Sequence, residues 1–504
     1  MTAPRYIRLD PADNLVVALA NLPEGEMVEG VTLTARVPRG HKIATRAIAP
    51  GENLLRYGQI IGVATRPVAP GDHVHSHNLG MGAHDTDYAH ATEAQPLSLP
   101  VEAREFMGHA RGDGQVGTRN YLGILTSVNC SGSVARFIAD EVERQGWLAD
   151  YPNIDGVVPI AHGMGCGMSN RDEGYATLMR TIRGYARNPN FGAVLLVGLG
   201  CEVMQVPDII AEGALRGDGL FRTMTIQEEG GTRRTVERGV AMLREMAPEA
   251  NRARRAPAPV SALCVALQCG GSDGYSGITA NPALGHASDL LVAHGGTTIL
   301  AETPEIYGAE HLLTRRAVSR AVGEKLVARI RWWENYTAAR GAEMDNNPSP
   351  GNKLGGLTTI LEKSLGAAAK GGRAPLSDVL LYGEPAREKG FLFMDSPGYD
   401  PVSVTGQVAS GANLVCFTTG RGSVSGYKPV PCVKLATNSE MFAHMSEDMD
   451  INCGDIVSDG VTLEEKGREI FETWIRVASG QATKSETLGF GGAEFVPWNI
   501  GAVM

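Results

Sequence analysis

The sequence predicts a multidomain α/β protein, in which a small N-terminal β domain precedes parallel-sheet α/β domains with covering helices. Three observations support this fold class. Residues 1–80 contain short apolar runs separated by Gly and Pro turns, which is typical of a β domain. From about residue 107, apolar strands alternate with amphipathic helices, as in a parallel sheet. A chain of 504 residues is also too long for one hydrophobic core.

The expected elements follow from hydrophobic periodicity along the chain. In the β domain, the apolar runs are 14–19, 31–35, 42–47 and 60–64. Next come strands 121–128, 156–160, 193–197 and 221–226, with helices 134–145, 172–187, 206–216 and 232–246. The later strands are 262–267, 297–301, 376–382, 391–395 and 414–417, with helices 279–294, 309–321, 322–339, 357–365 and 462–479.

Changes of pattern set the expected domain boundaries. Residues 81–106 lack periodicity and are interpreted as a linker after the β domain of residues 1–80. The basic, Pro-containing run 251–259 is interpreted as a second linker. We therefore expect a first α/β domain at 107–250, a second at 251–395 and a C-terminal α/β segment at 396–504.

Composition excludes several classes of protein. The net charge of −10 argues against nucleic acid or an anionic membrane as the main partner, because both require a basic surface. No run approaches the ~20 apolar residues that span a bilayer, and the N-terminus has no apolar core typical of a signal peptide. We expect a cytoplasmic protein whose 8 cysteines, with no CxxC pair among them, are thiols.

Three histidines alternate along one run of the N-terminal domain. In a strand, His73, His75 and His77 would point to the same face, because side chains alternate with a period of two. Three imidazoles on one face are a candidate metal site. The alternative interpretation is a solvated polar edge.

A polar, glycine-rich loop covers residues 268–281, between an expected strand and an expected helix. Open α/β sheets bind ligands at such positions, and a helix start offers free N–H groups to an anion. The alternative is an ordinary tight turn. Gly270-Gly-Ser-Asp-Gly274 also matches G-x-S-x-G, which would make Ser272 a hydrolase nucleophile. About eleven residues separate strand from helix here, whereas that motif needs a sharp turn.

Four thiols occupy equivalent places just after apolar strands. Cys130, Cys166, Cys201 and Cys269 would lie on one rim if their strands are neighbours in parallel sheets. Soft thiolates with a nearby imidazole such as His162 suit iron or zinc. The alternative is that small Cys residues simply pack well at strand ends.

Specific motifs recur along the chain in a characteristic order. They are Gly114-Gln-Val-Gly-Thr-Arg-Asn-Tyr121, Ser127-Val-Asn-Cys130, His162-Gly-Met-Gly-Cys-Gly167, Gln268-Cys-Gly-Gly-Ser-Asp273, Asn347-Pro-Ser-Pro-Gly-Asn352, Phe417-Thr-Thr-Gly-Arg-Gly422 and Asp450-Ile-Asn-Cys-Gly454. Together they resemble the altronate/galactarate dehydratase family. The first 80 residues are similar to the SAF (β-clip) domain of that family, with Gly40-His-Lys42 and Arg56-Tyr-Gly58 in place.

Within the family, His75-Ser-His-Asn78 resembles the altronate branch. The resemblance implies a hydro-lyase that converts altronate to 2-keto-3-deoxygluconate, with galactarate or another aldonate or aldarate as the alternative substrate. Met164 stands where small hydroxyl residues are commoner in the family, and this departure bears on the substrate. A non-catalytic sugar-acid binding protein is the alternative of another class.

The resemblance also implies a divalent metal, iron(II) first and manganese second, and a small-molecule sugar acid as the partner; a homo-oligomer stays open. The expected metal ligands are His75 and His77, with Cys130, Cys166 and Cys269 as the second choice. The expected acid/base residues are His162, Glu302, Lys363 and His41. Sugar hydroxyls are assigned to Asn129, Gln268, Ser272, Asp273 and Asn352, and the substrate carboxylate to Arg421 and Lys42.

Overall fold

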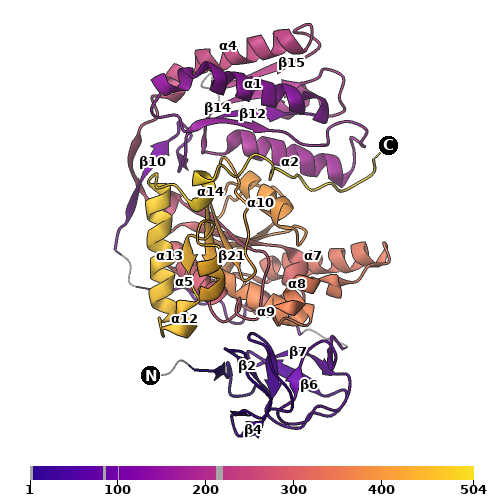
Figure 1. Cartoon of the computed structure of the whole chain (residues 1–504). Helices are drawn as coiled ribbons and strands as arrows, with labels where there is room; N and C mark the ends of the chain where they lie inside the picture. Colours follow the sequence, from indigo (N-terminus) through magenta and orange to yellow (C-terminus); the bar gives the residue numbers. More distant parts are fainter. Residues whose placement is uncertain (1–3, 83–86, 100–101, 212–219, 504) are drawn as a thin grey trace.

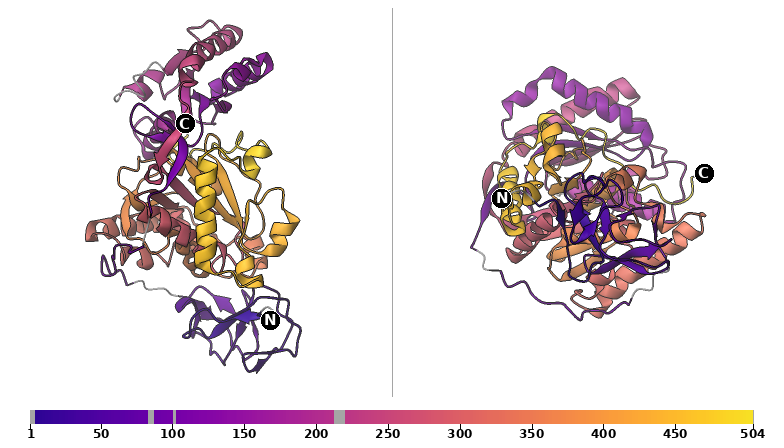
Figure 2. Two further views of the ribbon diagram at one scale, coloured as in Figure 1. Left: turned by 90° about the vertical axis from the view of Figure 1, so that its left-hand side faces the viewer. Right: turned by 60° about the horizontal axis from the view of Figure 1, so that its bottom comes forward.

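The computed structural model describes residues 4–82, 87–99, 102–211 and 220–503, and it consists of three units stacked along one axis (Figure 1). The N-terminal domain lies at one end and the first α/β domain at the other (Figure 2). A larger α/β domain lies between them. No helix in these described ranges is long and apolar enough to cross a membrane.

The N-terminal domain is built from short antiparallel strands, as its Gly and Pro turns predict. Its sheets have the orders β1-β2-β5-β8, β6-β7-β9 and β3-β4. The strands are β1 (Tyr6–Ile7), β2 (Leu15–Ala18), β3 (Met27–Val28), β4 (Val31–Thr32), β5 (Lys42–Ala44), β6 (Asn53–Arg56), β7 (Gln59–Ala64), β8 (His73–Val74) and β9 (Leu79–Gly80).

The first α/β domain is a parallel sheet with the order β13-β12-β14-β15. The strands are β12 (Tyr121–Thr126), β13 (Gly156–Ile160), β14 (Phe191–Gly198) and β15 (Phe221–Thr225). Helices α1 (Gly132–Gln145) and α4 (Thr232–Ala250) cover one face, and α2 (Glu173–Arg187) and α3 (Val206–Ile210) cover the other. All four predicted strands of this domain therefore exist.

The larger domain contains one parallel sheet of seven strands, in the order β19-β20-β18-β17-β21-β22-β23. They are β17 (Cys264–Cys269), β18 (Thr297–Ala301), β19 (Leu376–Leu380), β20 (Gly390–Met394), β21 (Leu414–Thr419), β22 (Cys432–Ala436) and β23 (Ile451–Asn452). Strands before and after residue 396 pair directly, as β17 does with β21. The predicted division between 251–395 and 396–504 is therefore wrong, because both segments share one sheet.

Helices cover both faces of this sheet. They are α5 (Ala280–Ala293), α6 (His311–Thr314), α7 (Arg320–Ala338), α8 (Pro350–Leu354), α9 (Ile360–Ala368), α10 (Asp400–Ala409), α11 (Ser439–His444), α12 (Asp455–Ser458), α13 (Leu463–Ala478) and α14 (Lys484–Thr487). Helix α10 also packs against α2, which joins the larger domain to the first α/β domain.

Both predicted linkers contribute to a small sheet between the two α/β domains. Strand β10 (Glu105–Ala110) pairs antiparallel with β11 (Val116–Gly117) and with β16 (Arg255–Pro259). The run 251–259 was predicted to be a linker, and it is partly a strand instead. Its prolines are tolerated because β16 is an edge strand of this sheet.

Candidate functional site

The glycine-rich loop after β17 lies where the strand order of the seven-stranded sheet reverses. Strand β17 pairs with β18 on one side and with β21 on the other. Ligands of open α/β sheets bind in the crevice at such a switch point. The loop after β21 meets it there, since the amides of Gly420 and Arg421 donate to the Gly271 carbonyl at 3.2 and 2.9 Å.

The N-terminal domain closes over this edge of the sheet. A Cβ placed on Gly274 would lie 2.2 Å from the carbonyl oxygen of Gly40, so only glycine allows this backbone contact. One ring nitrogen of His41, Nε2, lies 3.3 Å from the Leu354 carbonyl at the end of α8. Residues from the N-terminal domain therefore face the switch-point loop across a domain boundary.

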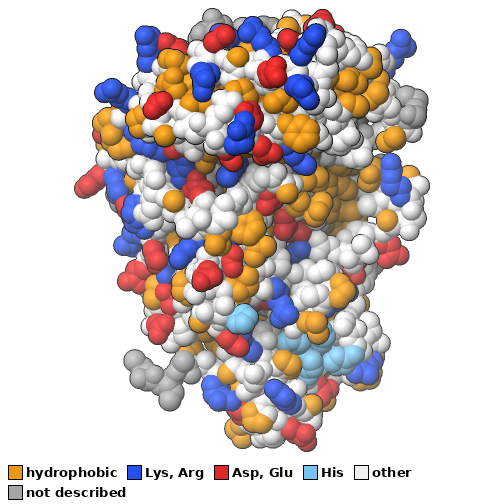
Figure 3. Space-filling view, turned by 45° about the horizontal axis from the view of Figure 1, so that its top comes forward, with side chains coloured by type: hydrophobic (Ala, Val, Ile, Leu, Met, Phe, Trp, Pro, Cys, Tyr) orange, Lys and Arg blue, Asp and Glu red, His pale blue; other side chains and the backbone are white. Residues whose placement is uncertain are grey.

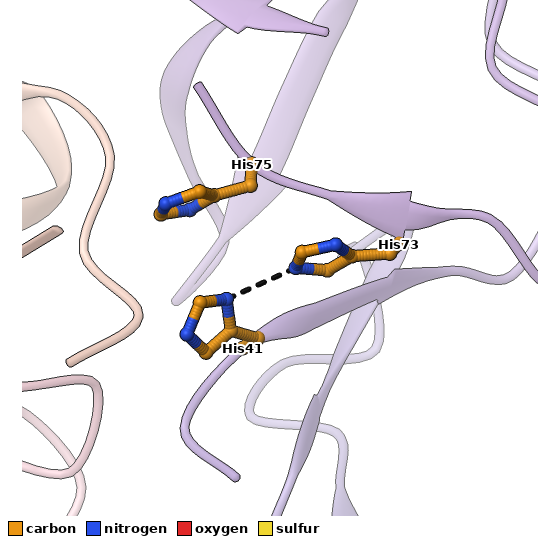
Figure 4. A group of neighbouring side chains, drawn as sticks. All are labelled: His41, His73 and His75. Carbon is orange, nitrogen blue, oxygen red and sulfur yellow. Dashed lines mark hydrogen bonds between the residues drawn. The ribbon is translucent and has the colours of Figure 1, made fainter. Parts of the chain in front are cut away.

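Three imidazoles gather on the N-terminal domain at this boundary (Figure 4). His41 Nδ1 lies 3.0 Å from His73 Nε2, and the ligand atoms of His41, His73 and His75 all lie within 4.8 Å of one another. The Nδ1 atom of His75 is buried without a hydrogen-bond partner. Histidine side chains are visible together on the surface of this lower part of the molecule (Figure 3).

The electronic state of these rings suits a metal ion. Burial, followed by the charges of neighbouring groups, lowers the pKa of His73 to about 4 and that of His75 to about 3. Burial also lowers the pKa of His41. Neutral imidazoles are the form that binds a metal, and the orphaned His75 nitrogen offers a lone pair, so this residue set fits a divalent ion.

The predicted member His77 is not in this group. Strand β8 ends at Val74, so the alternation that would align His77 with His75 stops before it. The His77 ring lies 5.4 Å from that of His73, but His41 from β5's approach supplies the third ligand instead. The sequence pattern marks the right segment and misses its partner, because the partner comes from a distant turn.

A second group of ionisable side chains is buried at the ends of β17 and β18. Lys370 Nζ lies 3.0 Å from Cys269 Sγ, and Lys363 Nζ lies 2.6 Å from Glu305 Oε1. Cys269, Glu302 and Glu305 also have ligand atoms within 4.8 Å of one another. Two ammonium groups already balance the carboxylates here, so this set suits a metal less well than the imidazoles do.

The two carboxyl groups of this cluster differ in protonation. Burial and the neighbouring Glu305 charge raise the pKa of Glu302 well above its usual range, and both its oxygens lack hydrogen-bond partners. Burial acts on Glu305 too, but the charges of Lys363 and Lys370 outweigh it and lower its pKa. A protonated and an ionised carboxyl side by side are a typical arrangement for acid/base chemistry.

Three members of the cluster escaped the sequence analysis: Glu305, Lys370 and Asp400. Burial raises the pKa of Asp400 to about 7. Lys370 follows Lys363 by seven residues, which places both on one side of the helical segment after Thr359. That spacing is the one sequence signal that could have found it.

Most of the predicted hydroxyl-binding residues are already engaged within the protein. Gln268 Nε2 donates to Ser403 Oγ at 2.5 Å, and Asn352 Nδ2 donates to the Ser272 carbonyl at 2.8 Å. Asp273 accepts from Thr437 Oγ1 at 3.0 Å and from several further donors. These three side chains hold the switch-point loop in place. No hydrogen bond joins the Ser272 hydroxyl to a histidine in the part of the chain described, so nothing activates Ser272 as a nucleophile.

The two predicted carboxylate-binding residues differ sharply. Lys42 is fully buried and its Nζ lies 2.9 Å from both oxygens of Glu362, so it joins the domains and is not available to a substrate. Arg421 is exposed beside Gly271, and its guanidinium has no ion-pair partner among the described residues. Arg421 is thus the one free cation of the predicted pair.

The remaining predicted residues lie in the first α/β domain. His162 Nε2 donates to the Thr126 carbonyl at 3.0 Å, and its Nδ1 accepts from the Met164 amide at 3.1 Å. Asn129 Nδ2 lies 3.3 Å from the His162 carbonyl. The predicted common rim of four thiols is wrong, because Cys269 ends a strand of a different sheet from Cys130 and Cys166.

These features define an α/β enzyme whose candidate site lies at the carboxyl edge of a parallel sheet, under a small β domain. Family models agree with all three units. Residues 4–82 match the altronate/galactarate dehydratase SAF domain, and 108–251 match the D-galactarate dehydratase/altronate hydrolase second domain. Residues 260–503 match the D-galactarate/altronate dehydratase C-terminal model.

Whole-length relatives give the same result. The chain is 38% identical to altronate dehydratase of Escherichia coli and 36% identical to altronate dehydratase of Bacillus subtilis, over 96% of this chain and 97% of each relative. It is 37% identical to galactarate dehydratase (L-threo-forming) of Escherichia coli, over 94% of this chain and 93% of that protein. The chain belongs to the altronate/galactarate dehydratase family, and it is a hydro-lyase that acts on a sugar acid.

Proposed function

We propose that this dehydratase removes water from altronate to give 2-keto-3-deoxygluconate. The observation that carries the proposal is the cluster of His41, His73 and His75 facing the switch-point loop across the domain boundary. The segment His75-Ser-His-Asn78, which resembles the altronate branch, supports this substrate. Galactarate is the alternative, because overall identity to the two kinds of relative is nearly equal.

The three imidazoles would hold a divalent metal ion, for which iron(II) is the first expectation and manganese the second. Such an ion supplies Lewis-acid stabilisation to the negative charge that develops when a proton is removed beside a carboxylate. The neutral state of the rings and the unpartnered His75 nitrogen support this assignment.

Proton transfer is assigned to the buried cluster around Glu305. Dehydration needs a base for the proton at C2 and an acid for the departing hydroxyl at C3. Lys363 is the member on the open side, since 7% of its side chain is exposed, and its ion pair with Glu305 fixes the ammonium in place. Glu302, protonated by its burial, stands behind it as a proton donor.

The substrate carboxylate is assigned to Arg421. Its guanidinium is exposed at the switch point, and the two parallel N–H groups of an arginine match a carboxylate. Asp273, Asn352 and Gln268 shape the loop that the substrate would contact.

The proposal is tested by incubating the protein with altronate and, separately, galactarate, with and without iron(II) under anaerobic conditions. We expect 2-keto-3-deoxy acid from altronate in the presence of iron(II). The variants His73→Ala and His75→Ala should lose bound iron together with activity, whereas His77→Ala, the matched control outside the cluster, should retain both. No keto acid from either sugar acid, or unchanged iron in both cluster variants, would contradict the proposal.

A further inference from the structure

Three exposed cysteines lie at one edge of the sheet in the first α/β domain. Cys130 follows β12, Cys166 follows β13 and Cys201 follows β14. These strands are parallel neighbours in the order β13-β12-β14, so their carboxyl ends meet at the same edge. None of the three thiols belongs to the site described above.

The loops that carry these cysteines are in direct contact. The Asn129 amide donates to the Met164 carbonyl at 2.9 Å, and the Met204 amide donates to the Gly165 carbonyl at 3.0 Å. Ser127 Oγ also donates to Glu202 Oε1 at 2.6 Å, which ties the first loop to the third. The Cys166 loop therefore lies between the other two.

Glycine permits this close assembly. A Cβ on Gly165 would lie 2.2 Å from the Ser127 carbonyl oxygen, and Gly165 has a φ of +101°. Gly200, next to Cys201, has a φ of +124°. Residues with side chains are strained in both places, so the backbone is adapted to bring three thiol-bearing loops together.

The exposure of these thiols is unusual. Cysteine is among the most buried residue types, and Cys269, Cys416, Cys432 and Cys453 are buried in this chain while Cys264 is half-buried. The three exposed thiols are the three at this edge. Packing does not explain them, because they are the cysteines that do not pack.

We propose that Cys130, Cys166 and Cys201 bind an iron–sulfur cluster. Thiolates are the ligands of such clusters, and each binds a different iron, so the thiols can stand farther apart than around one ion. Around a single tetrahedral zinc, thiolate sulfurs lie about 4 Å apart. No such compact group of these thiols exists among the described residues, in which only two other groups are close enough for one ion.

Polar groups around the thiols favour the same ligand. Gln227 Nε2 donates to Cys201 Sγ at 3.3 Å, and hydrogen bonds to sulfur tune such clusters. Cys130 lies in the turn that begins helix α1, where the positive end of the helix stabilises negative charge. This binding proposal stands apart from the proposed reaction and from the histidine site.

The test uses the full chain, purified without oxygen and reconstituted with iron(II) and sulfide. We expect bound iron and inorganic sulfide together with the visible absorption of an iron–sulfur cluster. Cys130→Ser, Cys166→Ser and Cys201→Ser should each reduce bound sulfide by about tenfold or more. Cys264→Ser, a half-buried thiol at the start of β17, and His73→Ala should leave bound sulfide unchanged.

Thiol alkylation with peptide mapping gives a readout that needs no variant. The cluster should protect the three cysteines in the reconstituted protein, and a chelator should expose all three. A wild-type chain that binds no sulfide, or that binds zinc without sulfide, would overturn the proposal. So would full alkylation of the three thiols after reconstitution, or sulfide retained in all three variants.

Discussion

Arg421 is the side chain whose assignment can be separated most cleanly from folding. It is exposed, makes no ion pair within the described ranges, and contributes only its backbone to the contact with Gly271. A hydrogen bond to a charged partner contributes about 1.5–3 kcal/mol. We therefore expect Arg421→Ala to raise the KM for the sugar acid by about tenfold or more, as measured by keto-acid formation, with the Tm unchanged.

The variant Arg421→Lys serves as the matched control. It keeps the charge and loses the forked geometry, so it should recover part of the affinity. A KM in Arg421→Ala equal to that of the wild type would show that the carboxylate binds elsewhere.

His162 has a structural role with a measurable pH signature. Burial lowers its pKa to about 4, from the usual 6.5 of the unfolded chain, and both ring nitrogens are bonded. Between these values the unfolded chain binds a proton that the folded chain does not bind. Its contribution is therefore complete above pH 6.5 and is lost as pH falls toward 4, by at most about 1.4 kcal/mol per pH unit.

We expect the Tm of His162→Gln to fall less steeply between pH 6.5 and 4 than that of the wild type. The exposed His444→Gln should follow the wild-type slope. Equal slopes for all three proteins, measured by thermal unfolding in matched buffers, would show that His162 is not the group responsible.

The residues that sequence predicts best are those whose neighbours along the chain determine their environment. Glu302 ends an apolar strand, so its position at the carboxyl edge follows from the pattern. The third metal ligand and the pairing of Lys42 depend instead on contacts across more than 30 and 300 residues of chain, respectively. No local pattern encodes such contacts, and the second one turns an expected substrate ligand into a buried tie between domains.

At the scale of elements, the alternation of apolar strands and helices predicts the parallel sheets because it reflects a repeated local unit. It does not predict which strands become neighbours. Strand β21 pairs with β17, although about 150 residues lie between their starts. That pairing unites the two predicted C-terminal segments, and it also creates the switch point that positions the glycine-rich loop.

Helix α9 connects the two halves of the candidate site. Its neighbouring residues Glu362 and Lys363 point to different partners: Glu362 binds Lys42 and Arg56 of the N-terminal domain, and Lys363 binds Glu305 in the buried cluster. A shift of the N-terminal domain would thus be transmitted to the proposed proton-transfer group through one turn of helix.

For the whole molecule, attachment of the N-terminal domain depends on a buried ion cluster. Glu362 accepts from Lys42 Nζ at 2.9 Å, from Arg56, and from Thr358 Oγ1 at 2.6 Å, and all three charged side chains are at most 1% exposed. Despite burial, the charges of Lys42 and Arg56 lower the pKa of Glu362 to about 2. Burial lowers the pKa of Lys42 to about 8, so both groups stay ionised at neutral pH.

Replacement of this carboxylate should therefore loosen the domain that carries the histidine cluster. Glu362→Gln leaves two buried cations without a counter-charge, and breaking a buried pair in this way costs about 3–5 kcal/mol. We expect a lower Tm, faster proteolytic release of the N-terminal domain, and weaker iron binding at neutral pH. Glu52→Gln, which removes an exposed ion pair with Arg46 in the same domain, should leave all three unchanged. If Glu362→Gln retained wild-type stability and iron content, the contact between α9 and the N-terminal domain would not be what holds the two halves of the site together.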